Sequence, residues 1–292
     1  MKIYLAGGIT GNLISFWKDV MKIYLSGTYS RPYIIKEAMK IYLAGGNTGY
    51  KWADDYDLEI IKHKPYILES YFYIKDNYKW LMKMKPFFKD FMLDSGAFSF
   101  FGKKNIEMDW IKYTEEYCDF INKYNIDNFI ELDIEKLTSM ELVEELREII
   151  IKKTKKKPIP VWRPSRGIDY WYKMIKEYDY VSISASGMFD SGWARKKGAE
   201  NILYKLIKEA KKENCKVHGL GYTNLKSLHQ VPFYSVDSTA WLYGNRGGYL
   251  YHFNGETIKQ IQLKNKKLIG RPAAVHNFNE WIKFQKYVDL YY

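Results

Sequence analysis

Three short stretches of the sequence place an aspartate directly behind an apolar run. Asp94 stands in "MLDSGAF", Asp133 in "FIELDIE" and Asp237 in "YSVDSTAW". Two carboxylates in one pocket can together catalyse a substitution at a sugar carbon. One attacks the carbon, and the other carries the proton of the leaving group. A pocket of low dielectric would raise the pKa of one and leave the other ionised. Each aspartate alone could equally be a helix N-cap, but three behind separate runs favour a shared site.

The segments that must position these residues alternate between two patterns. Amphipathic stretches with apolar residues every three or four positions predict helices at 110–124, 140–157 and 200–214. Between such stretches lie short apolar runs typical of strands, at 40–46, 66–70, 91–96, 128–135, 158–165, 180–187, 216–221 and 234–239. This alternation predicts a parallel sheet, and eight strands are the number that closes a (β/α)8 barrel. An open doubly wound sheet is the alternative.

In a (β/α)8 barrel the carboxyl ends of all strands meet at one face, where function lies. Polar residues gather at the ends of the predicted strands, namely Asp94, Asp133, Glu135, Arg163, Ser165, Ser184, Ser186, His218 and Asp237. We therefore expect side chains far apart in the sequence to converge on one pocket. Gly96 and Ala97 beside Asp94 would let a flat ligand approach the backbone closely.

The N-terminus contains three copies of one pattern, at 1–11, 21–30 and 39–49, each a β-prone run closed by glycine. We expect the third copy to be a strand of the main domain and residues 1–38 to form an appended β-rich segment. The domain at 39–292 would then be the barrel, and the stretch 256–292 reads as a helical tail.

The acidic stretches also resemble a known family. "MLDSGAF" is similar to the Asp-Ser-Gly-Gly-aromatic segment of tRNA-guanine transglycosylases, and "FIELDIE" occupies the place of that family's base-reading aspartate. "VHGLGYTNLKSL" followed by "YSVDSTAW" resembles its Gly-Val-Gly-Thr and nucleophile segments. Order and spacing agree over about residues 85–250, and the phage-type DNA 7-deazaguanine transglycosylases are the branch that the chain resembles most.

The resemblance implies a role for each aspartate. Asp237 would attack the anomeric carbon of a guanosine, Asp94 would move the proton to and from the base, and Asp133 would accept hydrogen bonds from the base's N–H groups. Phe98 and His218 would sandwich the base. The remaining positions of the family's base pocket fall on Ser95, Arg163, Ser184 and Gly219. Arg163 stands where the family has a glutamine, and Ser184 to Gly187 replace a Gly-Gly-Leu strand end, so the incoming base stays open.

Charge and cysteine content bear on the partner. Lys and Arg number 46 against 34 Asp and Glu, a formal charge of +12, which favours nucleic acid. The tRNA enzymes carry a zinc site of three cysteines and a histidine behind the nucleophile, whereas residues 238–292 contain no cysteine. We therefore expect no metal and no cofactor, and DNA rather than tRNA. Arg246 in "GNRGG" and Arg166 are candidate phosphate contacts, although Arg246 could be a solvated turn residue and Arg166 could pair with an acid.

Cys118 and Cys215 fit a reduced, cytoplasmic protein, in the host cytoplasm if the gene belongs to a phage. No apolar run is long enough to cross a membrane. The sequence thus predicts a pentosyltransferase that replaces guanine in nucleic acid with a 7-deazaguanine. Three alternatives stay open: an ordinary tRNA-guanine transglycosylase, a free-nucleoside deoxyribosyltransferase or glycosylase, and a barrel that binds nucleic acid without turnover. The oligomeric state, with a homodimer among the options, stays open too.

Overall fold

The computed structural model describes residues 2–5, 9–12, 38–46, 53–100, 108–184, 198–222, 228, 230–242, 249–262 and 270–291. The chain divides into two compact units, Met1–Glu37 and Ala38–Tyr292. In the first unit, β1 (Lys2–Leu5) pairs antiparallel with β2 (Ile9–Asn12), so the first sequence copy forms a small hairpin. The second copy, at 21–30, lies outside the described residues.

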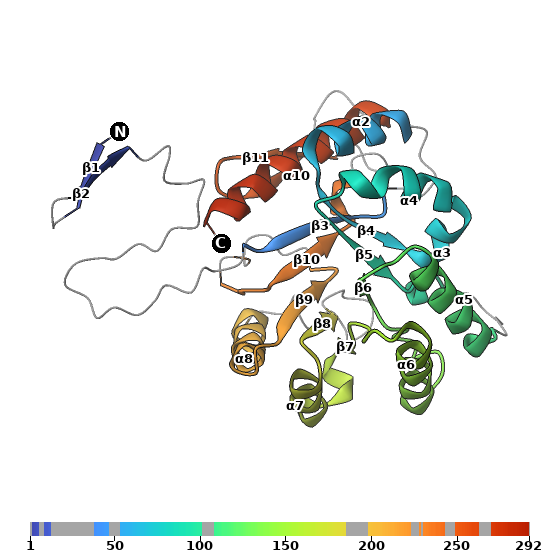
Figure 1. Cartoon of the computed structure of the whole chain (residues 1–292). Coiled ribbons are helices and arrows are strands. Elements are labelled where there is room, and N and C mark those ends of the chain that lie inside the picture. Colours follow the sequence, from blue (N-terminus) through green and yellow to red (C-terminus); the bar gives the residue numbers. More distant parts are fainter. Residues whose placement is uncertain are drawn as a thin grey trace. The chain divides into compact units, whose positions relative to one another are not determined.

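Eight parallel strands of the second unit form the barrel predicted from the sequence (Figure 1). They are β3 (Lys40–Ala44), β4 (Tyr66–Ser70), β5 (Asp90–Asp94), β6 (Asn128–Phe129), β7 (Val161–Trp162), β8 (Tyr180–Ser184), β9 (Lys216–Leu220) and β10 (Ser235–Ser238). Their order is β6-β5-β4-β3-β10-β9-β8-β7, so strands that follow one another in the chain pair, and the first strand, β3, also pairs with the last, β10. A parallel bridge between Ile130 and Ile159 joins β6 to β7, which closes the ring.

Helices lie outside the ring of strands (Figure 1). The longer ones are α2 (Ala53–His63), α4 (Tyr78–Met84), α5 (Trp110–Lys123), α6 (Met140–Thr154), α7 (Ile168–Glu177), α8 (Ala199–Lys212) and α10 (Arg271–Tyr291). Short turns of helix complete the connections, namely α3 (Tyr71–Ile74), η1 (Lys75–Asn77), η2 (Lys85–Phe87), η3 (Ala97–Phe100), η4 (Pro164–Arg166) and η6 (Ala240–Leu242). The three helices predicted from periodicity are confirmed as α5, α6 and α8. Side chains of Asp109 and Ser139 cap the first two by accepting backbone N–H groups.

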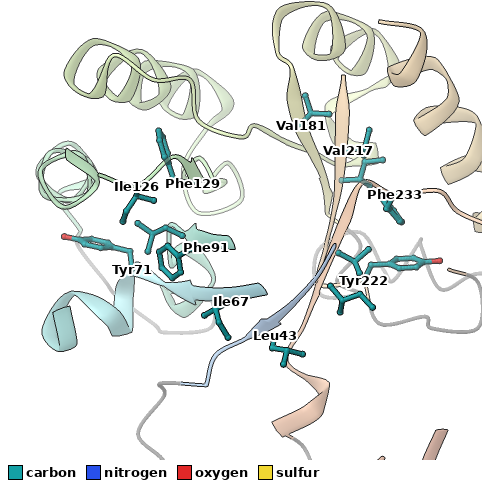
Figure 2. Close-up of a cluster of buried hydrophobic side chains, with 14 of the residues drawn as sticks. Leu43, Ile67, Tyr71, Phe91, Ile126, Phe129, Val181, Val217, Tyr222 and Phe233 are labelled. Carbon is teal, nitrogen blue, oxygen red and sulfur yellow. The ribbon is translucent and has the colours of Figure 1, made fainter. Parts of the chain in front are cut away.

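The period of two along each strand divides the core into an outer and an inner layer. Outward side chains pack against the helices, and Figure 2 shows part of this layer, including Leu43, Ile67, Phe91, Val181 and Val217. The inner layer fills the barrel with Tyr42, Ala44, Tyr66, Leu68, Met92, Ile130, Ile159 and Val161. Because the barrel is filled, a ligand can reach its axis only from one of the two ends. The barrel mouth, as the term is used below, is the end where the strands finish.

The tail at 256–292 differs from the expectation in its first part. β12 (Ile258–Gln262) pairs antiparallel with β11 (Tyr249–Phe253), and among the described residues of this stretch the helical ones are those of α10. The pattern of apolar residues did not decide between helix and strand for this segment. The neighbouring strand β11 supplies a pairing partner that a helix would leave unused. α10 packs on the barrel and on the β11–β12 hairpin: the Gln285 side chain accepts from the Ile41 N–H of β3 at 2.6 Å, and the Asn277 side chain accepts from the Tyr251 N–H of β11 at 2.8 Å. Within the described ranges, none of the helices has the length and apolarity that a membrane crossing requires.

Candidate active site

Asp94 ends β5 at the barrel mouth, where a tight turn holds it. The Gly96 N–H donates to Asp94 Oδ2 at 2.9 Å. Gly96 has a φ of +80°, and a Cβ there would lie 2.6 Å from Phe72 Cβ, so this turn requires glycine. Burial raises the pKa of Asp94 to about 6, the Gly96 N–H opposes that rise, and the negative charge of Asp237 adds to it. Asp94 can therefore gain or lose a proton near neutral pH.

Asp237 lies on β10, and its carboxylate is held from the neighbouring strand β9. The Gly221 N–H donates to Asp237 Oδ1 at 2.6 Å, and His218 Nε2 lies 3.2 Å from the same oxygen. The side chain is 8% exposed. Its negative charge adds to the rise in the pKa of Asp94, so the two carboxylates interact electrostatically although β5 and β10 are far apart in the sequence.

Asp133 follows β6 and contacts an arginine from the next strand. The Arg163 guanidinium, which is fully buried behind β7, donates to Asp133 Oδ2 and also pairs with Glu135 at 3.0 Å. Burial raises the pKa of Asp133 to about 7; Arg163 opposes the rise, whereas the charges of Glu135 and Asp94 add to it. Asp133 thus interacts electrostatically with Asp94 as well.

A network of buried ion pairs supports this side of the mouth. Arg166 donates to Glu135 through two bonds of 3.0 Å and to Glu131 at 2.8 Å. Arg147 of α6 reaches the other oxygen of Glu131 at 2.7 Å. The Val161 N–H also donates to Glu131, at 2.8 Å. Arginines and acids alternate through the network, so it fixes the ends of β6 and β7 while leaving little net charge.

Several residues of the expected base pocket lie elsewhere. The His218 ring is fully buried inside the barrel, with Nδ1 2.6 Å from Ser235 Oγ and Nε2 near Asp237, so it offers no exposed face for stacking. The physical reason is register: His218 pairs with Ser235, one inward position below Asp237. Gly219 faces outward, since a Cβ there would meet Tyr222, Phe233 and Val236 at 3.0 to 3.1 Å.

Ser95 is also buried, inside the turn that follows Asp94. Its side chain is buried and caps the Ala97 N–H at 3.5 Å, while its carbonyl accepts from Tyr113 of α5. Ser184, at the end of β8, is buried at the mouth. Phe98 on η3 directly follows the Asp94 turn and is 48% exposed, which suits a ring that covers a base.

The two candidate phosphate contacts have different outcomes. The Arg166 side chain is only 2% exposed and is paired with Glu131 and Glu135, which agrees with the alternative that it pairs with an acid. A direct contact with phosphate would have to break these pairs. Arg246 lies outside the described residues.

Sequence reasoning missed the residues that support the three aspartates. Glu131 stands in the same "FIELDIE" stretch as Asp133, but only the closure of the barrel between β6 and β7 brings Arg147 and Arg166 to it. Gly221 has a φ of +66°, and its presence directly after β9 was the available signal for a turn whose N–H can face the mouth. Among the described residues, no group of three His, Cys, Asp or Glu side chains is arranged to hold a metal ion.

No protein-family model and no curated protein matches the chain. Among solved structures, the chain is similar to that of a protein assigned as a fructose-1,6-biphosphate aldolase from Coccidioides immitis. The TM-score is 0.44 and the sequence identity 12%, over 87% of this chain and 88% of that chain. The class of the fold, a (β/α)8 barrel, rests on the strand order and closure of the chain itself.

Proposed function

We propose that the protein is a base-exchange transglycosylase that replaces guanine in nucleic acid, DNA by preference, with a 7-deazaguanine derivative. The observation that carries the proposal is that Asp94 and Asp237 both stand at the carboxyl ends of parallel barrel strands, where the charge of Asp237 adds to the raised pKa of Asp94, about 6. A carboxyl of that pKa beside a second carboxylate can serve as proton carrier next to a nucleophile. The resemblance to the transglycosylases supplies the substrate class.

The reaction divides into two displacements at the anomeric carbon. Asp237 attacks the carbon, and the bond between the carbon and the guanine nitrogen breaks. The base keeps both electrons of that bond and takes a proton from Asp94. The incoming base then gives its ring N–H proton to Asp94, its nitrogen attacks the same carbon, and the Asp237 carboxylate leaves. Two inversions retain the configuration.

The other side of the mouth would recognise the base. Arg163 occupies Asp133 Oδ2, so in this proposal Asp133 Oδ1 accepts from the N–H groups along the base edge. Phe98, exposed beside Asp94, would cover one face of the base. The formal charge of +12 supports a polyanionic substrate rather than a free nucleoside.

The direct test is mass spectrometry of nucleosides from DNA and from tRNA of cells that express the protein, with cells expressing Asp237→Asn as control. We expect a 7-deazaguanine nucleoside in DNA with the unaltered protein and none with the variant. The same product in tRNA alone would favour the tRNA enzyme instead. Unmodified DNA and tRNA, in cells supplied with deazaguanine bases, would refute the proposal.

Salt dependence separates the nucleoside alternative. A DNA-binding enzyme loses affinity steeply as salt rises, because each phosphate contact releases counterions. We expect the affinity for a DNA duplex to fall at least tenfold between about 50 and 200 mM salt. A free-nucleoside enzyme would show no such dependence.

A further inference from the structure

A line of hydrogen bonds runs inside the barrel and ends on Asp237. Tyr180 Oη lies 2.5 Å from Ser235 Oγ, and Ser235 Oγ lies 2.6 Å from His218 Nδ1. His218 Nε2 lies 3.2 Å from Asp237 Oδ1. Ser235 and His218 are fully buried, and the three strands β8, β9 and β10 contribute the four side chains.

Donor and acceptor chemistry gives this line one direction. An ionised Asp237 can only accept, so the proton between it and His218 belongs to Nε2. In a neutral imidazole Nδ1 then has a lone pair and must accept from the Ser235 hydroxyl. Ser235 Oγ can in turn accept from Tyr180, which remains protonated because burial raises its pKa. Every group in the line is satisfied in this arrangement without a charge on the imidazole.

The line acts on one oxygen of the nucleophile. Within the described part of the chain, both hydrogen bonds to Asp237, from His218 and from the Gly221 N–H, reach Oδ1. An oxygen that accepts from two N–H donors has both of its lone pairs engaged by those donors, so they are not available to attack a substrate. The other oxygen, Oδ2, is then the one that remains for attack.

We propose that His218, Ser235 and Tyr180 are positioning residues that fix His218 as its Nε2–H tautomer, anchor Asp237 through Oδ1 and present Oδ2 to the anomeric carbon. The kinetic half of this inference rests on the proposed function, and the structural half does not. His218 therefore acts through Asp237 and does not touch the base.

The structural half is tested without substrate. The full chain is labelled with 15N-histidine, and long-range proton–nitrogen spectra read which ring nitrogen carries the proton. The chain has five histidines, so the His218 signals are assigned by their absence from His218→Gln. We expect a neutral ring with its proton on Nε2. An Nδ1–H tautomer or an imidazolium would overturn the inference, whatever the enzyme does.

Ser235 offers a matched set of variants for both halves. Ser235→Ala removes the donor to Nδ1 and should shift the Nδ1 signal, whereas Ser235→Thr keeps a hydroxyl and should keep the signal. Ser182 is the control, since it is equally buried on β8 and pairs in register with His218, yet its hydroxyl donates to the Pro160 carbonyl. Ser182→Ala should leave the His218 spectrum unchanged. An Nδ1 signal that responds to Ser182→Ala as strongly as to Ser235→Ala would overturn the inference.

The kinetic half is measured as single-turnover formation of the covalent adduct between the protein and guanine-containing DNA. Ser235→Ala should slow adduct formation about tenfold, which corresponds to a barrier raised by ~1.4 kcal/mol, with DNA affinity changed less than twofold. Ser235→Thr should recover most of the rate, and Ser182→Ala should retain it. A Ser235→Ala protein with unaltered rate would overturn the positioning role. If the unaltered protein forms no adduct with DNA or tRNA, the proposed function fails, and the tautomer spectrum still decides the structural half.

Discussion

On the β6–β7 side of the barrel mouth Asp133 is held by charged groups, whereas on the β9–β10 side Asp237 is held by a backbone N–H and an imidazole. Arg163 contacts Asp133 directly, and Arg147, Arg166 and Glu131 extend the ion pairs outward. Asp237 instead receives the Gly221 N–H at 2.6 Å and His218 at 3.2 Å. A carboxylate beside a guanidinium is a fixed acceptor with much of its charge cancelled, which suits recognition. A carboxylate held by N–H groups keeps more of its charge, which suits a nucleophile.

The largest expected effect comes from replacing the aspartate of each side by asparagine. Asp237→Asn removes the attacking carboxylate, so we expect adduct formation to fall by at least about 10⁴-fold, the scale of losing a catalytic nucleophile. Asp133→Asn keeps an acceptor oxygen in place and should weaken substrate binding while adduct still forms at saturating DNA. Denaturing gels of protein mixed with labelled DNA measure both. An adduct that survives in Asp237→Asn would contradict the assignment of the nucleophile.

The supporting groups should differ in what they cost the fold. Glu131→Gln leaves two buried guanidinium groups with a neutral partner, and breaking such a buried pair costs about 3 to 5 kcal/mol of unfolding free energy. Ser235→Ala breaks bonds between neutral groups and should cost only about 1 to 2 kcal/mol. Urea unfolding of both variants gives the comparison. Equal losses of unfolding free energy in the two variants would mean that the ion pairs of the β6–β7 side contribute no more to stability than the neutral hydrogen bonds of the β9–β10 side.

The sequence predicted the parts of this site that depend on position along a strand. All eight strands were recognisable because each apolar run is short and bounded by turn residues, and Asp94 and Asp237 were recognisable because each stands where its run stops. The barrel geometry then brings their charges together. The position of both aspartates at strand ends of one barrel could therefore be predicted without coordinates, whereas their roles stay a prediction.

Register and pairing partners could not be predicted in the same way. Whether His218 faces the base or lies below Asp237 depends on a shift of one inward position between β9 and β10. The role of Glu131 depends on which strands meet when the ring closes. The stretch at 258–262 became a strand because Tyr249–Phe253 lies beside it. Each of these outcomes is decided by a contact between segments distant in the sequence, and local propensity carries no record of it.

Asp94 lies between the two sides, and its raised pKa has a cost in stability. In the unfolded chain a carboxyl titrates near pH 4, whereas folded Asp94 titrates near 6, so the folded state binds more protons between these values. Stability therefore falls as pH rises through this window and stays lowered above it. Asp94→Asn keeps an oxygen for the Gly96 N–H and should be more stable than the unaltered protein by about 3 kcal/mol at pH 7.5. Chemical unfolding of both proteins at pH 3.5 and at pH 7.5 is the measurement.

The pH dependence supplies the control for that prediction. Below about pH 4 the carboxyl is protonated in both states, so the advantage of Asp94→Asn should vanish there. A variant that is equally stabilised at pH 3.5 and 7.5 would show that the gain has another cause. A variant less stable than the unaltered protein at pH 7.5 would contradict the raised pKa.

The smallest expected effect concerns the turn that orients Asp94. Gly96→Ala and Gly255→Ala both place an alanine at positive φ, at +80° and +98°, which costs each about 1 kcal/mol. A Cβ at Gly255 meets nothing within 4 Å, whereas a Cβ at Gly96 would lie 2.6 Å from Phe72 Cβ. Gly96→Ala should therefore lose about 1 kcal/mol more than Gly255→Ala, since overpacking adds to the backbone strain. It should also slow adduct formation, because the N–H that holds Asp94 Oδ2 must move, while Gly255→Ala keeps full activity. Equal stability and equal rates in the two variants would mean that Asp94 does not depend on this turn, and that the two sides of the mouth alone define the site.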